Sequence, residues 1–218
     1  MLSFSTPPQR RMFKAGAVAV AALGVGLTAA CASMTSPGMM GAGMMGPENA
    51  QAMMASWPES SRMAAMDMMK KYGPPQEITP TSMLWRNNGP WKWTQVRSTE
   101  IQHNFPMPHP DVMEQAINYR VPSDMFDELA MYDGSVIAER TRGELSARCD
   151  KEGANFLAVN LAHDVATRRR TVEQARQYYA AAIKTFMGTG RMDPYMQRLQ
   201  FQPPAGDAGD PDVAAMAG

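Results

Sequence analysis

Two histidines, a methionine and an aspartate lie close together in the segment HNFPMPHPD, residues 103–111. His103 and His109 could supply imidazole nitrogens to a metal ion, with a thioether from Met107 and a carboxylate from Asp111 beside them. Their spacing matches no common metal site, and histidines in a proline-rich loop also serve as surface or capping residues. The segment is therefore a candidate metal site, and a surface role is the alternative interpretation.

A second set of metal ligands could come from methionine pairs in the near-repeat GMMGAGMMG, residues 38–46. The paired residues are Met39, Met40, Met44 and Met45. Thioether sulfur is a soft ligand that suits Cu(I), so copper is the candidate cofactor here. The alternative is a flexible tether without a metal role. Met63, Met66 and Met69 recur at helical spacing, and we expect them to form the buried face of a helix.

Cys149 and His163 are the other residues that could serve an enzyme. Cys149 alternates with Leu145 and Ala147 along a predicted strand, which indicates a buried and unreactive thiol. His163 lies beside the apolar stripe of a predicted helix, where we expect it to be partly buried. The sequence contains no Ser-, Cys- or Asp-centred catalytic motif. An enzyme that uses Cys149 or a histidine is therefore the least favoured functional hypothesis.

Three tryptophans lie on a predicted hairpin. Trp91 and Trp93 are two residues apart on one strand, so we expect them to point to the same side, and Trp85 precedes them across the turn. Exposed together, they would form a stacking platform for a glycan or a protein partner. Buried, they would belong to the core, and the sequence leaves both interpretations open.

The N-terminal 30 residues are typical of a signal peptide. Residues 1–14 contain Arg10, Arg11 and Lys14 without an acidic residue, and residues 15–30 form an apolar run rich in Ala and Gly. This run is too short and too weakly hydrophobic to favour a transmembrane helix. We therefore expect the chain to be exported.

Two motifs in this region resemble known targeting signals. Leu27-Thr28-Ala29-Ala30-Cys31 resembles the bacterial lipobox, which implies that Cys31 receives diacylglycerol and anchors the chain to a membrane of the cell envelope, the outer membrane being favoured. Ordinary cleavage that leaves a free thiol is the alternative. Arg10-Arg11-Met12-Phe13-Lys14 is similar to a twin-arginine signal, which implies export in the folded state. Its alternative is a merely basic region.

The remaining sequence predicts a tether over residues 31–55, one domain over 56–202 and a disordered tail over 203–218. A capping box of Ser56 and Glu59 begins the first helix, and one of Thr171 and Gln174 begins the last. Asp150 is expected to cap the helix between them. The expected strands are Ser82–Arg86, Trp91–Ser98, Gln115–Val121, Ser135–Arg140 and Glu144–Cys149, with a helix over Asp124–Tyr132. This order predicts an α+β fold, an antiparallel sheet of about five strands with helices on one face.

Charge excludes one class of partner. The chain has 21 basic and 21 acidic residues, and removal of the signal peptide leaves 18 basic residues against the same 21 acidic ones. A nucleic-acid partner would require a basic surface. We therefore expect no nucleic-acid partner.

The stretch from Tyr72 to Met187 resembles an uncharacterised family of bacterial exported proteins. The resemblance is carried by the motifs YGPPQEITP, WRNNGPWKW, INYRVPSDMFDELAMYDGSV and ERTRGELSARCD. The first helix, Gly73-Pro74-Pro75 and the tryptophan-bearing strand are also similar to small envelope lipoproteins of the outer-membrane assembly accessory type. These resemblances imply an envelope setting and no particular activity. The leading hypothesis is a non-enzymatic envelope lipoprotein that binds another protein or a glycan, with metal handling as the alternative.

Overall fold

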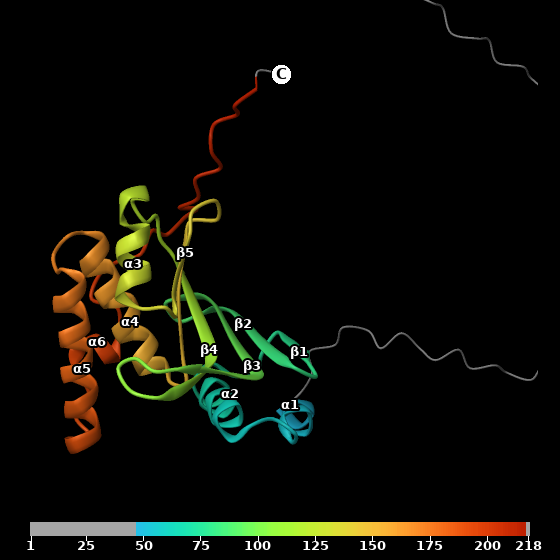
Figure 1. Cartoon of the computed structure of the whole chain (residues 1–218). Coiled ribbons are helices and arrows are strands. Elements are labelled where there is room, and N and C mark those ends of the chain that lie inside the picture. The colour runs from blue at the N-terminus through green and yellow to red at the C-terminus, as the bar shows by residue number, and fades with distance from the viewer. Residues whose placement is uncertain (1–46, 217–218) are drawn as a thin grey trace, which may run out of the picture. The chain divides into compact units, whose positions relative to one another are not determined.

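A six-stranded antiparallel sheet forms the centre of the domain (Figure 1). The computed structural model describes residues 47–216, so Cys31 and the methionine pairs lie outside the described residues. The strands are β1 Glu77–Thr79, β2 Ser82–Asn88, β3 Trp91–His103, β4 His109–Asn118, β5 Val136–Glu139 and β6 Glu144–Cys149. Their order across the sheet is β1-β2-β3-β4-β6-β5. The predicted α+β class is confirmed, and the short strand β1 raises the strand count from about five to six.

The helices cover one face of this sheet. They are α1 Pro47–Met54, α2 Glu59–Tyr72, α3 Phe126–Tyr132, α4 Glu152–Ala166, α5 Val172–Thr189 and α6 Pro194–Gln197, with a short 3-10 turn, η1 Ser123–Met125, before α3. Helix α2 packs against β3 and β4, and α4 packs against β4 and β6. Helix α5 lies outside α4 and also contacts α3 (Figure 1). Within residues 47–216, no helix has the length and apolar character needed to cross a bilayer.

The folded domain begins earlier than predicted. Residues 47–54, assigned from sequence to a flexible tether, form helix α1, and its Ala50 and Met54 are buried with Trp57 and Trp85. The C-terminal region also differs from its prediction, because Asp210 accepts bonds from Arg120 and Arg140. These contacts fix residues that were expected to be disordered. Regular structure in the described residues therefore begins at Pro47, and side-chain contacts with the domain reach Asp210.

Helix α2 buries a different face from the expected one. Met63 and Met66 are each 56% exposed, whereas Ala64, Ala65 and Met68 are buried. The predicted capping box is also absent, because Pro58 is the N-cap residue and no side chain caps the helix. The methionine spacing was correct for a helix, but the small residues Ala64 and Ala65 let α2 approach the sheet closely.

Both predicted hairpins are present, and the first depends on its turn. Asn87 and Gly89 have positive φ values of 50° and 66°, which suit residues that tolerate the left-handed region. A Cβ atom at Gly89 would lie 2.9 Å from Cε1 of Tyr72, at the end of α2. A glycine is required here both by the turn and by the packing of α2.

Helices α4 and α5 differ in how they begin. Thr171 and Gln174 form the predicted capping box of α5, with both reciprocal bonds present. The N-cap residue of α4 is Lys151 rather than Asp150, and it makes no side-chain cap. Glu152, the first residue of α4, instead turns toward the sheet and accepts bonds from Lys71, Tyr72, Trp91 and Gln115. This carboxylate ties α2, β3 and β4 to α4.

Candidate metal centre

The β3–β4 hairpin brings the two predicted metal ligands together. His103 ends β3 and His109 begins β4, and the two residues are directly paired across the strands. Asp111 follows two residues later and is fully buried within the hairpin. One ligand atom from each of these three side chains lies within 4.8 Å of the other two. The fold therefore brings His103, His109 and Asp111 together as a compact group of side chains that could hold a metal ion.

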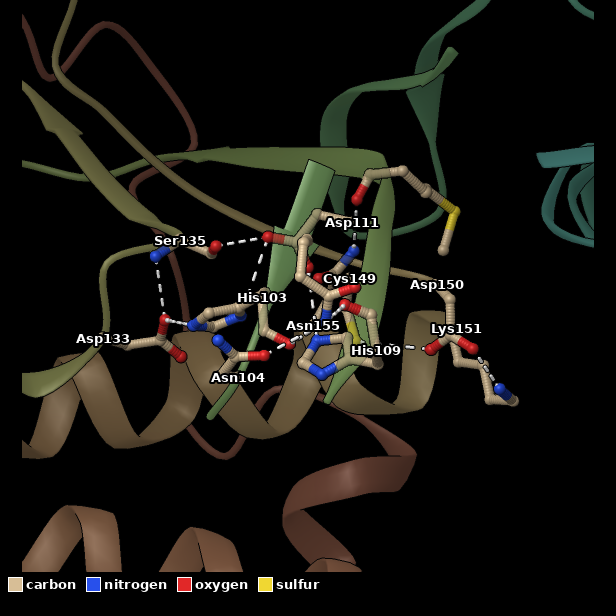
Figure 2. Close-up of polar contacts among 12 residues, drawn as sticks. His103, Asn104, His109, Asp111, Asp133, Ser135, Cys149, Asp150, Lys151 and Asn155 are labelled. Carbon is tan, nitrogen blue, oxygen red and sulfur yellow. Dashed lines mark hydrogen bonds and ion pairs between the residues drawn. The ribbon is translucent and has the colours of Figure 1, made fainter. Parts of the chain in front are cut away.

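Each of the three side chains is held by a second contact (Figure 2). His103 Nε2 lies 3.5 Å from Asp133 Oδ1, and His109 Nδ1 lies 2.8 Å from the carbonyl oxygen of Met107. The hydroxyl of Ser135 donates to Asp111 Oδ2. On the inner side, His103 Nδ1 lies 3.7 Å from Asp111 Oδ2, and His109 Nε2 lies 3.3 Å from Asp111 Oδ1. Outer partners of this kind fix the orientation and the tautomer of metal ligands.

Two of the inward atoms lack hydrogen-bond partners. His103 Nδ1 and Asp111 Oδ1 are buried and unpartnered, although Asp111 Oδ1 lies 3.3 Å from His109 Nε2. Buried polar atoms are normally satisfied, so each such atom needs an explanation. The Glu152 carboxylate is a useful contrast, because both of its oxygens accept hydrogen bonds. A cation between the three inward atoms would satisfy the two unpartnered ones, so the residues present fit a metal ion.

The comparisons with known proteins give no family. No protein-family model, curated protein or solved structure matches this chain. What the site does must therefore be inferred from its own side chains.

The local electrostatics favour positive charge between the histidines and Asp111. The adjacent Asp111 carboxylate, together with Cys149, raises the pKa of His109 from 6.5 to about 11, against the opposing effect of burial. Burial raises the pKa of Asp133, although the backbone N–H of Ser135 opposes this effect. In the absence of a metal, protonated His109 therefore provides the positive charge that stabilises the buried Asp111 carboxylate.

This titration should make the metal-free domain less stable as the pH rises. Because the pKa of His109 is higher in the folded state, its stabilising contribution is complete below pH 6.5 and is lost between pH 6.5 and about 11. We expect His109→Gln to flatten the decline in the urea midpoint of chelator-treated protein across this range. His163→Gln is the control, because burial lowers the pKa of His163 and confines its effect to lower pH. An unchanged decline in His109→Gln would contradict the assignment.

Cys149 lies beside this group and is buried, as the sequence predicted. Burial raises the pKa of its thiol, and the neighbouring His109 opposes this rise. The thiol also donates to Asp150 Oδ1 at 3.5 Å. Because a nucleophile requires a readily formed thiolate, this environment favours a structural thiol.

The tryptophans do not form one exposed platform. Trp85 and Trp91 are 0% and 1% exposed, and their indole nitrogens donate to Gly73 O and to Glu152 Oε1. Trp93 donates to Glu144 Oε2 and lines a groove with Arg86 and Glu114 on the sheet face opposite the helices. Trp91 and Trp93 therefore point to opposite sides, contrary to the sequence prediction, and only Trp93 is available to a partner.

His163 has the partly buried position on α4 that the sequence predicted. Its Nδ1 atom lies 2.7 Å from the hydroxyl of Tyr119, and its ring stacks on Phe201 with a centroid distance of 3.9 Å. It lies outside the metal-ligand group. The structural role expected for His163 is consistent with these contacts.

Sequence analysis missed Asp133 and Ser135. Both lie in the connection between α3 and β5, where the sequence indicated only the end of a helix and the start of a strand. They reach His103 and Asp111 because β5 lies near the same end of the sheet (Figure 2). No local pattern could identify them, since their role depends on a contact between distant segments.

Proposed function

We propose that this domain binds a divalent transition-metal ion through His103, His109 and Asp111. The observation that supports the proposal is the convergence of three possible ligands, buried Asp111 and partly buried His103 and His109. Of their atoms, His103 Nδ1 and Asp111 Oδ1 are buried without a hydrogen-bond partner. The outer contacts from Asp133, Ser135 and the Met107 carbonyl would hold the ligands in place. The sequence predicted metal handling through the methionine pairs and His103 with His109, and the present proposal keeps the two histidines and adds Asp111.

The ligand chemistry favours a borderline ion. Two imidazoles and one carboxylate suit Zn²⁺, Cu²⁺ or Fe²⁺, whereas Cu(I) prefers softer sulfur ligands. Three protein ligands would leave a coordination position for water or another small ligand, where the ion would act as a Lewis acid. His109 would have to release its proton before binding, and Asp111 would neutralise one charge of the ion. The methionine pairs of residues 38–46 are not needed in this proposal.

The expected result of a Zn²⁺ titration follows from the charge of His109. We expect the purified protein to bind one Zn²⁺ in competition with a chelator and to release about one proton, so that affinity rises about tenfold per pH unit near neutrality. Deletion of residues 34–46 should leave this affinity unchanged. Proton release would be measured in weakly buffered solution. Binding that disappears with the deletion would place the site on the methionine pairs instead.

We also propose that the protein acts in the bacterial cell envelope as an exported lipoprotein. Support comes from the sequence alone, from the signal-peptide pattern and the lipobox-like motif that ends at Cys31. A diacyl anchor would attach the domain stably to a membrane. The intact mass of membrane-extracted protein tests this, with Cys31→Ala as the control. A mass without added acyl chains would contradict the anchor and leave the metal proposal standing.

A further inference from the structure

A cavity of about 350 Å³ lies beside the candidate metal centre. It is bounded by the β3–β4 connection, the start of α4, and the segment from α5 to α6. Its buried lining consists of Cys149, Ala154, Tyr179 and Met196. The volume falls within the range of about 300–1,000 Å³ that is typical of small-molecule sites. The buried part of the lining is apolar apart from the Cys149 thiol and the Tyr179 hydroxyl, so it suits an aliphatic or aromatic group.

Exposed methionines surround the opening of this cavity. Met107, Met187 and Met192 all line it, and all three are among the large apolar side chains that the domain exposes to solvent. Grouped exposed apolar side chains often mark a binding site. Methionine is flexible and polarizable, so it can adapt to a chain-like ligand. The opening therefore has the character of an entrance for an apolar molecule.

One cationic side chain lines the same cavity outside the metal-ligand group. The Lys151 side chain is 60% exposed and pairs with Asp150 beside it. An exposed ion pair contributes little free energy, so the ammonium group can exchange this partner for another carboxylate. Gly153 also lines the cavity in the first turn of α4, where backbone N–H groups lack intrahelical acceptors. These donors favour an anionic head group near the opening.

We propose that the cavity binds a medium-chain aliphatic monocarboxylate, with its chain against Tyr179 and Met196 and its carboxylate at Lys151. The proposal goes beyond metal binding and does not depend on it. His109 lines the cavity, but His103 and Asp111 do not. A ligand could therefore bind whether or not the metal site is filled.

Octanoate and octanol test the proposal in the unaltered protein. We expect octanoate to bind in calorimetry with up to about fivefold higher affinity than octanol, because its carboxylate can form an ion pair with the exposed Lys151 ammonium group. Octanoate should also slow alkylation of Cys149 by N-ethylmaleimide, since this thiol lies in the cavity wall. Both measurements should be made with chelator and again with Zn²⁺. Octanoate binding without Zn²⁺ binding would overturn only the metal proposal.

Two pairs of variants locate the ligand. Ile183→Trp should abolish octanoate binding by filling the cavity, whereas Ala180→Trp, at an exposed position of the same helix, should not. Lys151→Met should lower octanoate affinity by up to about fivefold without changing that of octanol. Lys184→Met, at an exposed position outside the cavity, is its control.

Several results would overturn the inference. Equal affinities for octanoate and octanol would remove the carboxylate preference, and absence of binding by both would exclude an aliphatic ligand. Uptake of Cu(I) that protects Cys149, with no effect of octanoate, would show that the cavity sulfur atoms form a soft-metal site. If Ile183→Trp fails to fold, protection of Cys149 in the unaltered protein still decides between these outcomes.

Discussion

Asp111→Asn will lower the affinity of the domain for Zn²⁺ by more than about 100-fold. Loss of an outer partner of a metal site typically costs about 10- to 100-fold in affinity, and Asp111 is an inner ligand in the proposed site. The asparagine keeps the size of the side chain and can still accept the bond from the Ser135 hydroxyl. It removes the negative charge beside His103 and His109. The measurement is Zn²⁺ titration against a competing chelator.

Two further variants make this result specific. Asp133→Asn changes the carboxylate that contacts His103 Nε2 from outside, so it should weaken Zn²⁺ binding by about 10- to 100-fold. Asp127→Asn, at an exposed position of α3, should leave binding unchanged. Thermal unfolding in chelator would show that each variant is folded. Equal affinities for Asp111→Asn and the unaltered protein would exclude Asp111 as a ligand and contradict the proposed site.

Much of the fold could be predicted because its signals are local. The turn of the first hairpin needs residues that tolerate positive φ, and Asn87 and Gly89 supply them two residues apart in sequence. Thr171 and Gln174 are likewise close enough along the chain to specify the start of α5. From the sequence, His103 and His109 could be grouped only because both are possible metal ligands in one short segment. Their direct opposition depends on the register of β3 against β4.

Predictions failed where burial depends on distant segments. Methionine spacing gave the correct helix but the wrong buried face, because Met63 and Met66 lie away from the sheet while Ala64 and Ala65 pack against it. Because α2 contains many methionines, the sequence did not indicate that its small residues form the face that packs closely on the sheet. In the same way, no local signal could show that α1 would fold back and bury Met54.

The side chains of the candidate metal centre could also be predicted only in part. Sequence spacing suggested His103 and His109 with Asp111 in the same segment, whereas the outer contacts from Asp133 and Ser135 come from the fold. Asp133 and Ser135 follow α3, and the sheet places them beside β3 and β4. These contacts around the candidate site can be identified only when the register of β3 against β4 and the position of the α3–β5 connection are known.

Alanine at Trp85 should cause a much larger loss of stability than alanine at Trp93. The Trp85 side chain is fully buried between α2 and the sheet and donates to the carbonyl oxygen of Gly73. Removing a buried tryptophan typically costs about 3–5 kcal/mol, which lowers Tm by about 6–20 °C in a domain of this size. Because whole domains are stable by only about 5–15 kcal/mol, Trp85→Ala should be close to unfolding under mild conditions.

Trp93→Ala is the matched comparison that separates core from partner surface. Trp93 is half-buried on the opposite face of the sheet and makes one hydrogen bond, to Glu144, so its loss removes less buried apolar area and should cost clearly less than loss of Trp85. Urea unfolding of both variants, followed by circular dichroism, measures the difference. A partner platform that includes all three tryptophans requires the opposite pattern, in which Trp85→Ala stays stable and loses binding. If the order of stability is as expected, any partner surface must be sought around Trp93, on the face of the sheet that no helix covers.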